Sequence, residues 1–350
     1  MRVVPLIISV LITVGLIICL DRQWGSLPPV GRFLSPQEGF WQNAEPVAND
    51  FNADIQLPQL KDKGKVYFDD RLVPHIFANN EEDAYFMQGY LHAKFRLWQM
   101  EFQVLAAGGR LSEILGPGAG NVYLNHDREM RRLGMLYAAE KGLMEIEKDP
   151  TTKKDCDAYT SGVNAYISNL KESELPLEYK LLNYKPELWS NGKIALFMKN
   201  MSYELAGADE DFEMTNAKAI FSKEDFSKLY PAVQDSLDPV IPKGTVFPPA
   251  RIQLKIPATL DSLYLNNKDT VTAREFKPER NNGSNNWAIN GKKSKSGRPI
   301  LCNDPHLGTN LPAIWYELQI QTKEFNDYGV SFPGAPYVVI GFNDSCAWGL

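Results

Sequence analysis

The sequence predicts an α+β fold in which a helix-rich first part precedes a strand-rich last part. Residues 81–107 contain no proline and place apolar side chains at helical spacing, and residues 155–170 and 191–205 show a similar pattern. After Ser284, two short apolar runs flank a basic turn, a pattern typical of a β-hairpin. With 350 residues, of which 44% are hydrophobic and 23% charged, the chain can bury a large core.

The N-terminus is an apolar segment directed to a membrane. Arg2 precedes an uncharged run that extends from Val3 to Leu20, a length between that of a cleavable signal and that of a minimal spanning helix. Residues 1–22 are therefore predicted to be a signal peptide or a membrane anchor, and the lack of a clear small-x-small cleavage site favours the anchor. Residues 23–60, rich in proline and glycine, are predicted to form an extended linker.

The next elements are a strand region and a long helix. Residues 64–77 alternate in a strand-like way with a turn in the middle. Asn79 or Asn80 is placed to cap the helix of residues 81–107, and Gly108 follows its last apolar residue. We expect this helix to pack in the core.

Three polar residues inside this helix are expected to be structural. His92 and Arg96 lie four residues apart, on one helical face, and are predicted to form a satisfied pair. Arg96 and Glu101 are predicted to take part in buried ion pairs rather than in catalysis.

The character of the chain changes between Ser236 and Gly283. Proline recurs in this stretch, and charged residues become frequent near its end. Such a composition favours an exposed, irregular segment, because a long structureless stretch is uncommon inside a compact domain.

Ser284 is the strongest candidate for a nucleophile. A cut between Gly283 and Ser284 would give Ser284 a free α-amine beside its hydroxyl. An α-amine has an unperturbed pKa of about 7.7–8.0, so it can serve as the general base for its own hydroxyl near neutral pH. The alternative is that Asn282-Gly283 is only a turn before a strand, because Asn-Gly is a strong turn signal.

Several motifs in order resemble the penicillin acylase (penicillin amidase) family of N-terminal-nucleophile hydrolases. The resemblance runs from about Lys65 to Leu350. Its motifs are residues 73–76 (VPHI), 88–93 (QGYLHA), 96–101 (RLWQME), 109–113 (GRLSE), 284–289 (SNNWAI) and 303–307 (NDPHL).

The resemblance implies a four-layer αββα sandwich, of which this chain would hold an incomplete part. Residues 61–235 would be a helix-rich first chain, residues 236–283 a spacer and residues 284–350 the start of a second chain, so that the sequence is a precursor truncated at its C-terminus. The two cleaved chains would remain together as a heterodimer. The body would lie outside the cytoplasm, either in the periplasm or anchored to the membrane.

The resemblance also implies an activity and its residues. The protein would release a carboxylic acid from a small N-acyl amide, as penicillin, cephalosporin or acyl-homoserine-lactone acylases do. Ser284 and His306 would be catalytic, with cleavage between Gly283 and Ser284. For His306 the bland reading is that it caps the turn at Pro305.

Met201 and Leu205 are implied to bind the acyl group, although residues four apart on a helix more often belong to the core. The chemistry would need no cofactor. Glu213 is implied as a ligand of a structural calcium ion, although the acidic stretch of residues 209–213 also reads as a solvated loop.

Composition excludes some other functions. The net charge of −6 and the pI near 5.4 argue against a nucleic-acid partner. The four cysteines have no metal-binding spacing, and no G-x-S-x-G motif indicates a conventional serine hydrolase. The remaining alternative is a membrane-anchored, non-catalytic binding protein of the same fold, which would stay uncut.

Overall fold

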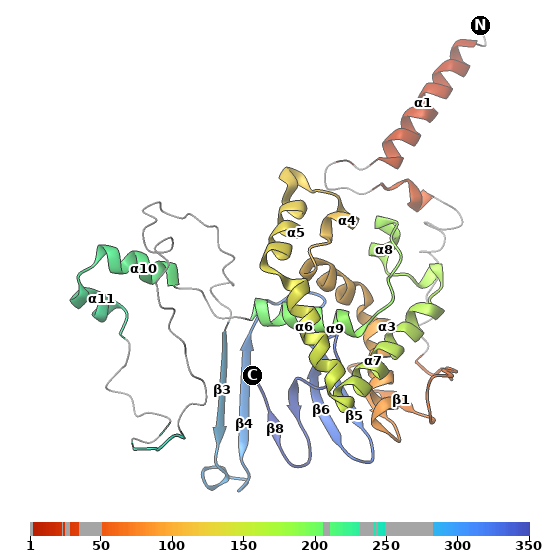
Figure 1. The fold of residues 1–350 in the computed structure, drawn as a ribbon. Coiled ribbons are helices and arrows are strands. Elements are labelled where there is room, and N and C mark those ends of the chain that lie inside the picture. The colour runs from red at the N-terminus through yellow and green to blue at the C-terminus, as the bar shows by residue number, and fades with distance from the viewer. Residues whose placement is uncertain are drawn as a thin grey trace. The chain divides into compact units, whose positions relative to one another are not determined.

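The computed structural model describes residues 3–22, 24, 29–34, 51–205, 211–231, 241, 244–248 and 283–350 (Figure 1). Contacts divide the chain into two units, one of Met1–Leu205 with Asn281–Leu350 and the other of Ala206–Arg280. The first unit combines a helix-rich region with a sheet, which confirms the predicted α+β class. Most of the predicted spacer lies outside the described residues.

The helices of the first unit come before its last strands in the chain. They are α1 Val3–Asp21, α3 Glu81–Ala107, α4 Leu111–Leu115, α5 Val122–Leu133, α6 Met135–Lys148, α7 Pro150–Asn169, α8 Leu177–Leu182 and α9 Asn191–Glu204. Four short 3-10 turns accompany them: η1 Gly31–Leu34, η2 Ala119–Asn121, η3 Glu172–Glu174 and η4 Gly291–Lys293.

The long helix α3 has the bounds that its sequence predicts. Asn80 caps its start, because the Asn80 side chain accepts a hydrogen bond from the backbone N–H of Asp83. Gly108 caps its end. Gly89 on α3 lies against the backbone of Tyr159, and Gly162 on α7 lies against the backbone of Phe86. Each glycine thus allows α3 and α7 to approach more closely than any side chain would permit.

A six-stranded sheet unites distant parts of the chain. Its order is β1-β2-β5-β6-β7-β8, and only the β2–β5 pair among these neighbours is parallel. The strands are β1 Lys65–Phe68, β2 Pro74–Phe77, β5 Tyr316–Gln321, β6 Asn326–Ser331, β7 Ile340–Phe342 and β8 Ala347–Trp348. The β2–β5 pairing joins the region before α3 to the end of the chain, so neither part completes the sheet alone.

The two faces of this sheet differ. Along β5, Tyr316, Leu318 and Ile320 are buried in the same hydrophobic cluster as residues of α3 and α7. Glu317 and Gln319 alternate with them on the other face and are only half-buried. Helices therefore cover one face, whereas the other carries polar side chains.

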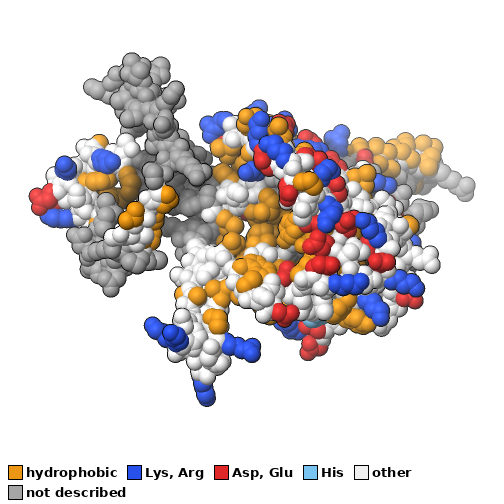
Figure 2. Space-filling model, turned by 60° about the horizontal axis from the view of Figure 1, so that its bottom comes forward, with side chains coloured by type: hydrophobic (Ala, Val, Ile, Leu, Met, Phe, Trp, Pro, Cys, Tyr) orange, Lys and Arg blue, Asp and Glu red, His pale blue; other side chains and the backbone are white. Residues whose placement is uncertain are grey.

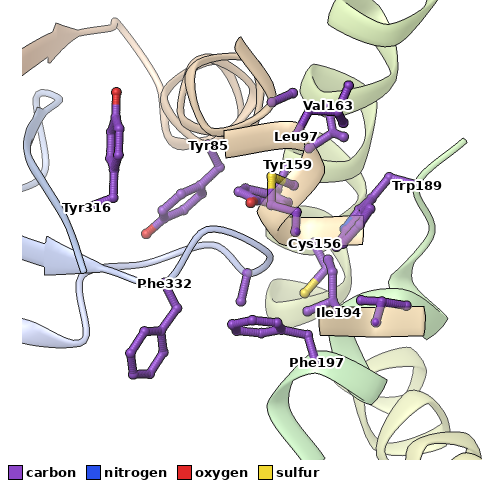
Figure 3. Packing of buried hydrophobic residues seen from close by; sticks show 14 of the residues in the cluster. Tyr85, Leu97, Cys156, Tyr159, Val163, Trp189, Ile194, Phe197, Tyr316 and Phe332 are labelled. Carbon is purple, nitrogen blue, oxygen red and sulfur yellow. The ribbon is translucent and has the colours of Figure 1, made fainter. Parts of the chain in front are cut away.

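The hydrophobic core is densest between α7, α9 and the loop after β6 (Figure 3). Phe197 on α9 lies against Phe332, with ring centroids 6.1 Å apart. Gly334 has φ +133°, and a β-carbon there would stand 2.9 Å from the Phe197 ring. The loop after β6 can therefore follow its path only with glycine at this position.

A separate two-stranded sheet holds the segment after the predicted spacer. Strand β3, Gly283–Ile289, pairs antiparallel with β4, Ile300–His306. The predicted hairpin is confirmed, but its returning strand runs further than expected. Pro305 and His306 belong to that strand, so the reading of His306 as the cap of a turn is wrong.

The second unit contains α10, Asp211–Ile220, and α11, Lys223–Leu229. Ser222 caps α11, because its hydroxyl accepts a hydrogen bond from the backbone N–H of Asp225.

Helix α1 is long and apolar enough to cross a membrane, with a mean hydropathy of 3.0 and no buried residue. Hydrophobic side chains cover it on the face seen in Figure 2. It is the one such helix among the residues described, and a signal sequence near an N-terminus has the same properties. An N-terminal apolar helix of this kind is consistent with export.

Candidate active site

The site predicted around Ser284 is built on the β3–β4 hairpin. Ser284 is the second residue of β3 and pairs with Pro305, whereas Gly283 pairs with His306. Residues directly opposite each other in an antiparallel pair share a face, and successive residues alternate. The side chain of Ser284 therefore points to one face of the hairpin, and the imidazole of His306 points to the other.

His306 lies beside the residue that would precede the cut. Its Nδ1 is 3.9 Å from the place where a β-carbon on Gly283 would stand. Its Nε2 lies 2.7 Å from Oδ2 of Asp304, two residues earlier on the same face. The imidazole is thus bound to Asp304 rather than to the hydroxyl of Ser284, and the predicted catalytic role of His306 stays a prediction.

Gly283 itself is unstrained. It lies in a strand and is not among the glycines with a left-handed φ in the described part of the chain. The expectation that glycine is needed here for a strained backbone is therefore not met. The open space around its α-carbon remains, because His306 is the only neighbour that an added β-carbon would meet within 4 Å.

An amide pair occupies the face that carries Ser284. The Asn286 amide donates a hydrogen bond of 3.0 Å to Oδ1 of Asn303 on the neighbouring strand. The Nδ2 of Asn303 is buried and has no partner among the described residues, and Gly349 packs closely against this side chain. Sequence reasoning missed this pair, because its members meet only through the strand register.

The two predicted acyl-binding residues differ in environment. Met201 is 2% exposed and belongs to the core cluster, whereas Leu205 is 41% exposed. Leu205 caps α9, and its backbone N–H donates to the carbonyl of Met201 at 2.9 Å. Of the two, only Leu205 has a side chain that solvent reaches.

The predicted calcium ligand lies at the edge of what the structure describes. Glu213 belongs to α10, but its side chain is outside the described part. The described residues contain no group of three or more His, Cys, Asp or Glu side chains that could hold a metal. Calcium takes six to eight oxygen ligands. These residues therefore do not make a calcium site, and no step below involves the ion.

A buried polar network lies behind the sheet. His92 is fully buried and bonds through Nδ1 to the Tyr159 hydroxyl at 2.8 Å and through Nε2 to the Ser331 hydroxyl at 2.9 Å. The predicted pair of His92 with Arg96 is therefore wrong. Arg96 instead lies 5.6 Å from the ring centroid of Tyr316.

Glu101 is buried, as predicted, but its partners are mainly neutral. It accepts hydrogen bonds from the Tyr179 hydroxyl at 2.5 Å and from the backbone N–H of Glu187 at 2.8 Å, whereas Lys193 is 3.8 Å away. Burial raises the pKa of Glu101, although these bonds oppose the rise. Arg110 binds Glu187 through two hydrogen bonds and lowers the pKa of that carboxyl to about 2.

Comparisons with known proteins agree with one another. The acyl-homoserine lactone acylase QuiP of Pseudomonas aeruginosa is 31% identical over 335 residues, which are 94% of this chain and 35% of that protein. The penicillin acylase 2 proenzyme of Pseudomonas sp. is 29% identical over 81% of this chain and 35% of its own length. A solved thermostable penicillin G acylase from Alcaligenes faecalis, 23% identical, aligns with 54% of this chain and 98% of its own at a TM-score of 0.42.

The chain spans about a third of the length of these two acylases. The family model for penicillin amidase matches residues 63–350, which is most of the sequence. The chain belongs to the penicillin amidase family.

Proposed function

We propose that this protein is part of an exported amide hydrolase that matures by cleavage between Gly283 and Ser284. The observation that carries the proposal is the register of the hairpin. Because Ser284 is the second residue of β3 and is paired with β4, a cut before it would leave Ser284 as the first residue of a fixed strand. A nucleophile and its base would then be held on one rigid element.

The cleavage would proceed as an N-to-O acyl shift. The hydroxyl oxygen of Ser284 bonds to the carbonyl carbon of Gly283, and the bond from that carbon to the Ser284 nitrogen breaks. The hydroxyl proton ends on the nitrogen. Water then hydrolyses the resulting ester, which leaves a carboxylate on Gly283 and a free hydroxyl and α-amine on Ser284. The printed name of one relative, a proenzyme, supports such a maturation step.

The mature residue would act by acyl transfer. The Ser284 hydroxyl attacks the carbonyl of an N-acyl substrate, and its own α-amine takes the proton and returns it to the leaving amine. Water then releases the acid and restores the hydroxyl. The unperturbed pKa of an α-amine, about 7.7–8.0, suits this exchange near neutral pH.

The relatives suggest the class of substrate. Their names describe acylases of acyl-homoserine lactones and of penicillins. We infer that the substrate is a small N-acyl amide of one of these kinds, with the acyl group beside the C-terminal end of α9. The exposed side chain of Leu205 is the candidate contact there.

The two cleaved chains would stay together as a heterodimer. The parallel β2–β5 pair crosses from the first chain to the second. So do the hydrogen bonds from Gln88 to both backbone groups of Tyr337, each 3.1 Å long. The polar face of the six-stranded sheet would be the surface on which the second sheet of the four-layer αββα sandwich packs.

The apolar helix α1 would direct export, either as a signal or as an anchor. The catalytic body would then act outside the cytoplasm. Removing Val3–Asp21 should leave the rest of the protein in the soluble fraction, because no residue of α1 is buried.

The test compares the complete protein with its Ser284→Ala variant, using Ser296→Ala in the same hairpin as a matched control. Intact mass should show two chains for the wild type and the control, the second beginning at Ser284, and one uncut chain for Ser284→Ala. A panel of N-acyl-homoserine lactones and phenylacetyl amides should be hydrolysed only by the cut proteins. An uncut and inactive wild type would instead favour the non-catalytic binding protein.

A further inference from the structure

We propose that Asp304 is the positioning residue of His306, and that this pair serves the cleavage at Gly283 rather than the activation of the Ser284 hydroxyl. The inference rests on the proposed function, because it concerns the same cut. Its basis is the position of the imidazole on the Gly283 side of the hairpin.

Asp304 and His306 are two residues apart on β4 and therefore share a face. The Oδ2 of Asp304 lies 2.7 Å from Nε2 of His306. A carboxylate accepts only, so Nε2 carries the hydrogen and the neutral ring keeps its lone pair on Nδ1. Asp304 thereby fixes both the tautomer and the direction of the ring.

The free nitrogen then faces the bond to be cut. Nδ1 adjoins Gly283, 3.9 Å from the position of an added β-carbon, and Gly283 is the residue paired with His306. The hydroxyl of Ser284 points to the opposite face. His306 is thus better placed for the carbonyl and nitrogen of the Gly283–Ser284 bond than for the side chain of Ser284.

The pair supplies what the acyl shift needs. As the Ser284 oxygen bonds to the Gly283 carbon, its proton passes through solvent water to Nδ1. The same proton passes on to the Ser284 nitrogen as the carbon–nitrogen bond breaks, so the imidazole ends neutral. Asp304 remains a carboxylate and stabilises the imidazolium that forms in between.

The competing explanation is a surface pair without function. His306 and Asp304 are 45% and 57% exposed, and an exposed pair contributes about 0–1 kcal/mol to stability. Loss of such a pair would leave both the rate of cleavage and the melting temperature nearly unchanged. The proposal instead predicts a change in the rate of cleavage alone.

The experiment follows cleavage of the complete precursor over time by intact mass. Asp304→Asn and His306→Gln should each slow it at least about tenfold, a modest part of what general acid–base catalysis supplies. The double variant should be no slower than His306→Gln, because Asp304 acts through His306. Asp304→Glu should retain part of the rate, and Asp344→Asn, an exposed carboxylate in the same part of the chain, should cleave normally.

A second arm bypasses the cut. The first chain is expressed together with a second chain that already begins at Ser284, and turnover of an N-acyl amide is measured. The Asp304→Asn form should keep turnover within about threefold of the wild type, while its precursor remains slow to mature.

Three results would overturn the assignment: cleavage of Asp304→Asn at the normal rate, a double variant slower than His306→Gln, or an equal loss of turnover in the bypassed form. A wild-type precursor that never cuts would instead refute the proposed function.

Discussion

His92 donates a hydrogen bond from Nε2 to the hydroxyl of Ser331, and both residues are fully buried. The direction follows from the neighbours. Ser331 donates its own hydrogen to the carbonyl of Tyr316, so it accepts from His92. The Tyr159 hydroxyl accepts from the backbone N–H of Gly334 and donates to Nδ1. One neutral tautomer of His92 therefore satisfies the whole chain from α7 through α3 to β6.

This network predicts an acid sensitivity. Burial lowers the pKa of His92 to about 3, from the model value of 6.5. Because the folded form resists protonation, the stabilising contribution is complete above pH 6.5 and is lost as the pH falls toward 3. The loss is at most about 1.4 kcal/mol per pH unit.

The measurement is urea unfolding of the wild type and of His92→Gln at pH 7 and pH 5. Between these values the wild type should lose about 2 kcal/mol more than the variant, in which position 92 no longer titrates. Titrating carboxylates contribute equally to both proteins. Identical pH dependence of the two would contradict the burial of a neutral histidine.

The close approach of α3 and α7 predicts a contrast between glycines. Gly89→Ala or Gly162→Ala would drive a methyl group into the backbone of the partner helix, so each should cost several kcal/mol or prevent folding. Gly142 on α6 lies 3.5 Å from the Ala195 side chain, an ordinary contact. Gly142→Ala should therefore stabilise the protein by about 0.5–1 kcal/mol. Melting curves of the three variants decide the matter, and tolerance of Gly89→Ala would show that the helices are further apart.

Local patterns predicted the helices better than they predicted the site. The bounds of α3 follow from a capping asparagine, a proline-free amphipathic run and a terminal glycine, all of which act within a few residues. The β2–β5 pairing aligns His75 with Gln319, and no local signal specifies such a register.

The same limit applies to the functional residues. Whether Ser284 and His306 share a face depends on parity, and a slip of one residue in the hairpin would reverse the answer. Pro305 suggested the end of a strand, yet a strand at the edge of a sheet tolerates proline. The partner of His92 was mistaken because helical spacing alone does not reveal which side chains the sheet presents.

The buried carboxylate of Glu101 predicts a sensitivity to loss of charge without loss of size. Glu101→Gln would place amide hydrogens against the Tyr179 hydroxyl and the Glu187 N–H, which are both donors. We expect a loss of about 1–3 kcal/mol. Glu145→Gln, at a surface pair with Lys148, should cost less than about 1 kcal/mol. Chemical denaturation at pH 7 measures both, and similar small losses would mean that Glu101 is not held as an acceptor.

The last prediction separates Met201 from Leu205. Met201 is 2% exposed in the core, so Met201→Ala should destabilise the protein by about 2–5 kcal/mol. Leu205 is 41% exposed, so Leu205→Ala should change stability by less than about 1 kcal/mol. If its side chain contacts the acyl group, Leu205→Ala should shift kcat/KM toward longer acyl chains, because removing the side chain enlarges the pocket.

The assay uses the complete, cleaved protein with N-acyl amides of four to twelve acyl carbons, alongside thermal melting. A small change of one or two methylenes in pocket size corresponds to about 10–200-fold in relative kcat/KM. Leu188→Ala, another exposed leucine of the first chain, serves as the control and should leave the preference unchanged. An unchanged profile in Leu205→Ala would remove Leu205 from the acyl pocket. A shifted profile in Met201→Ala at full stability would show that Met201 lines the pocket rather than the core.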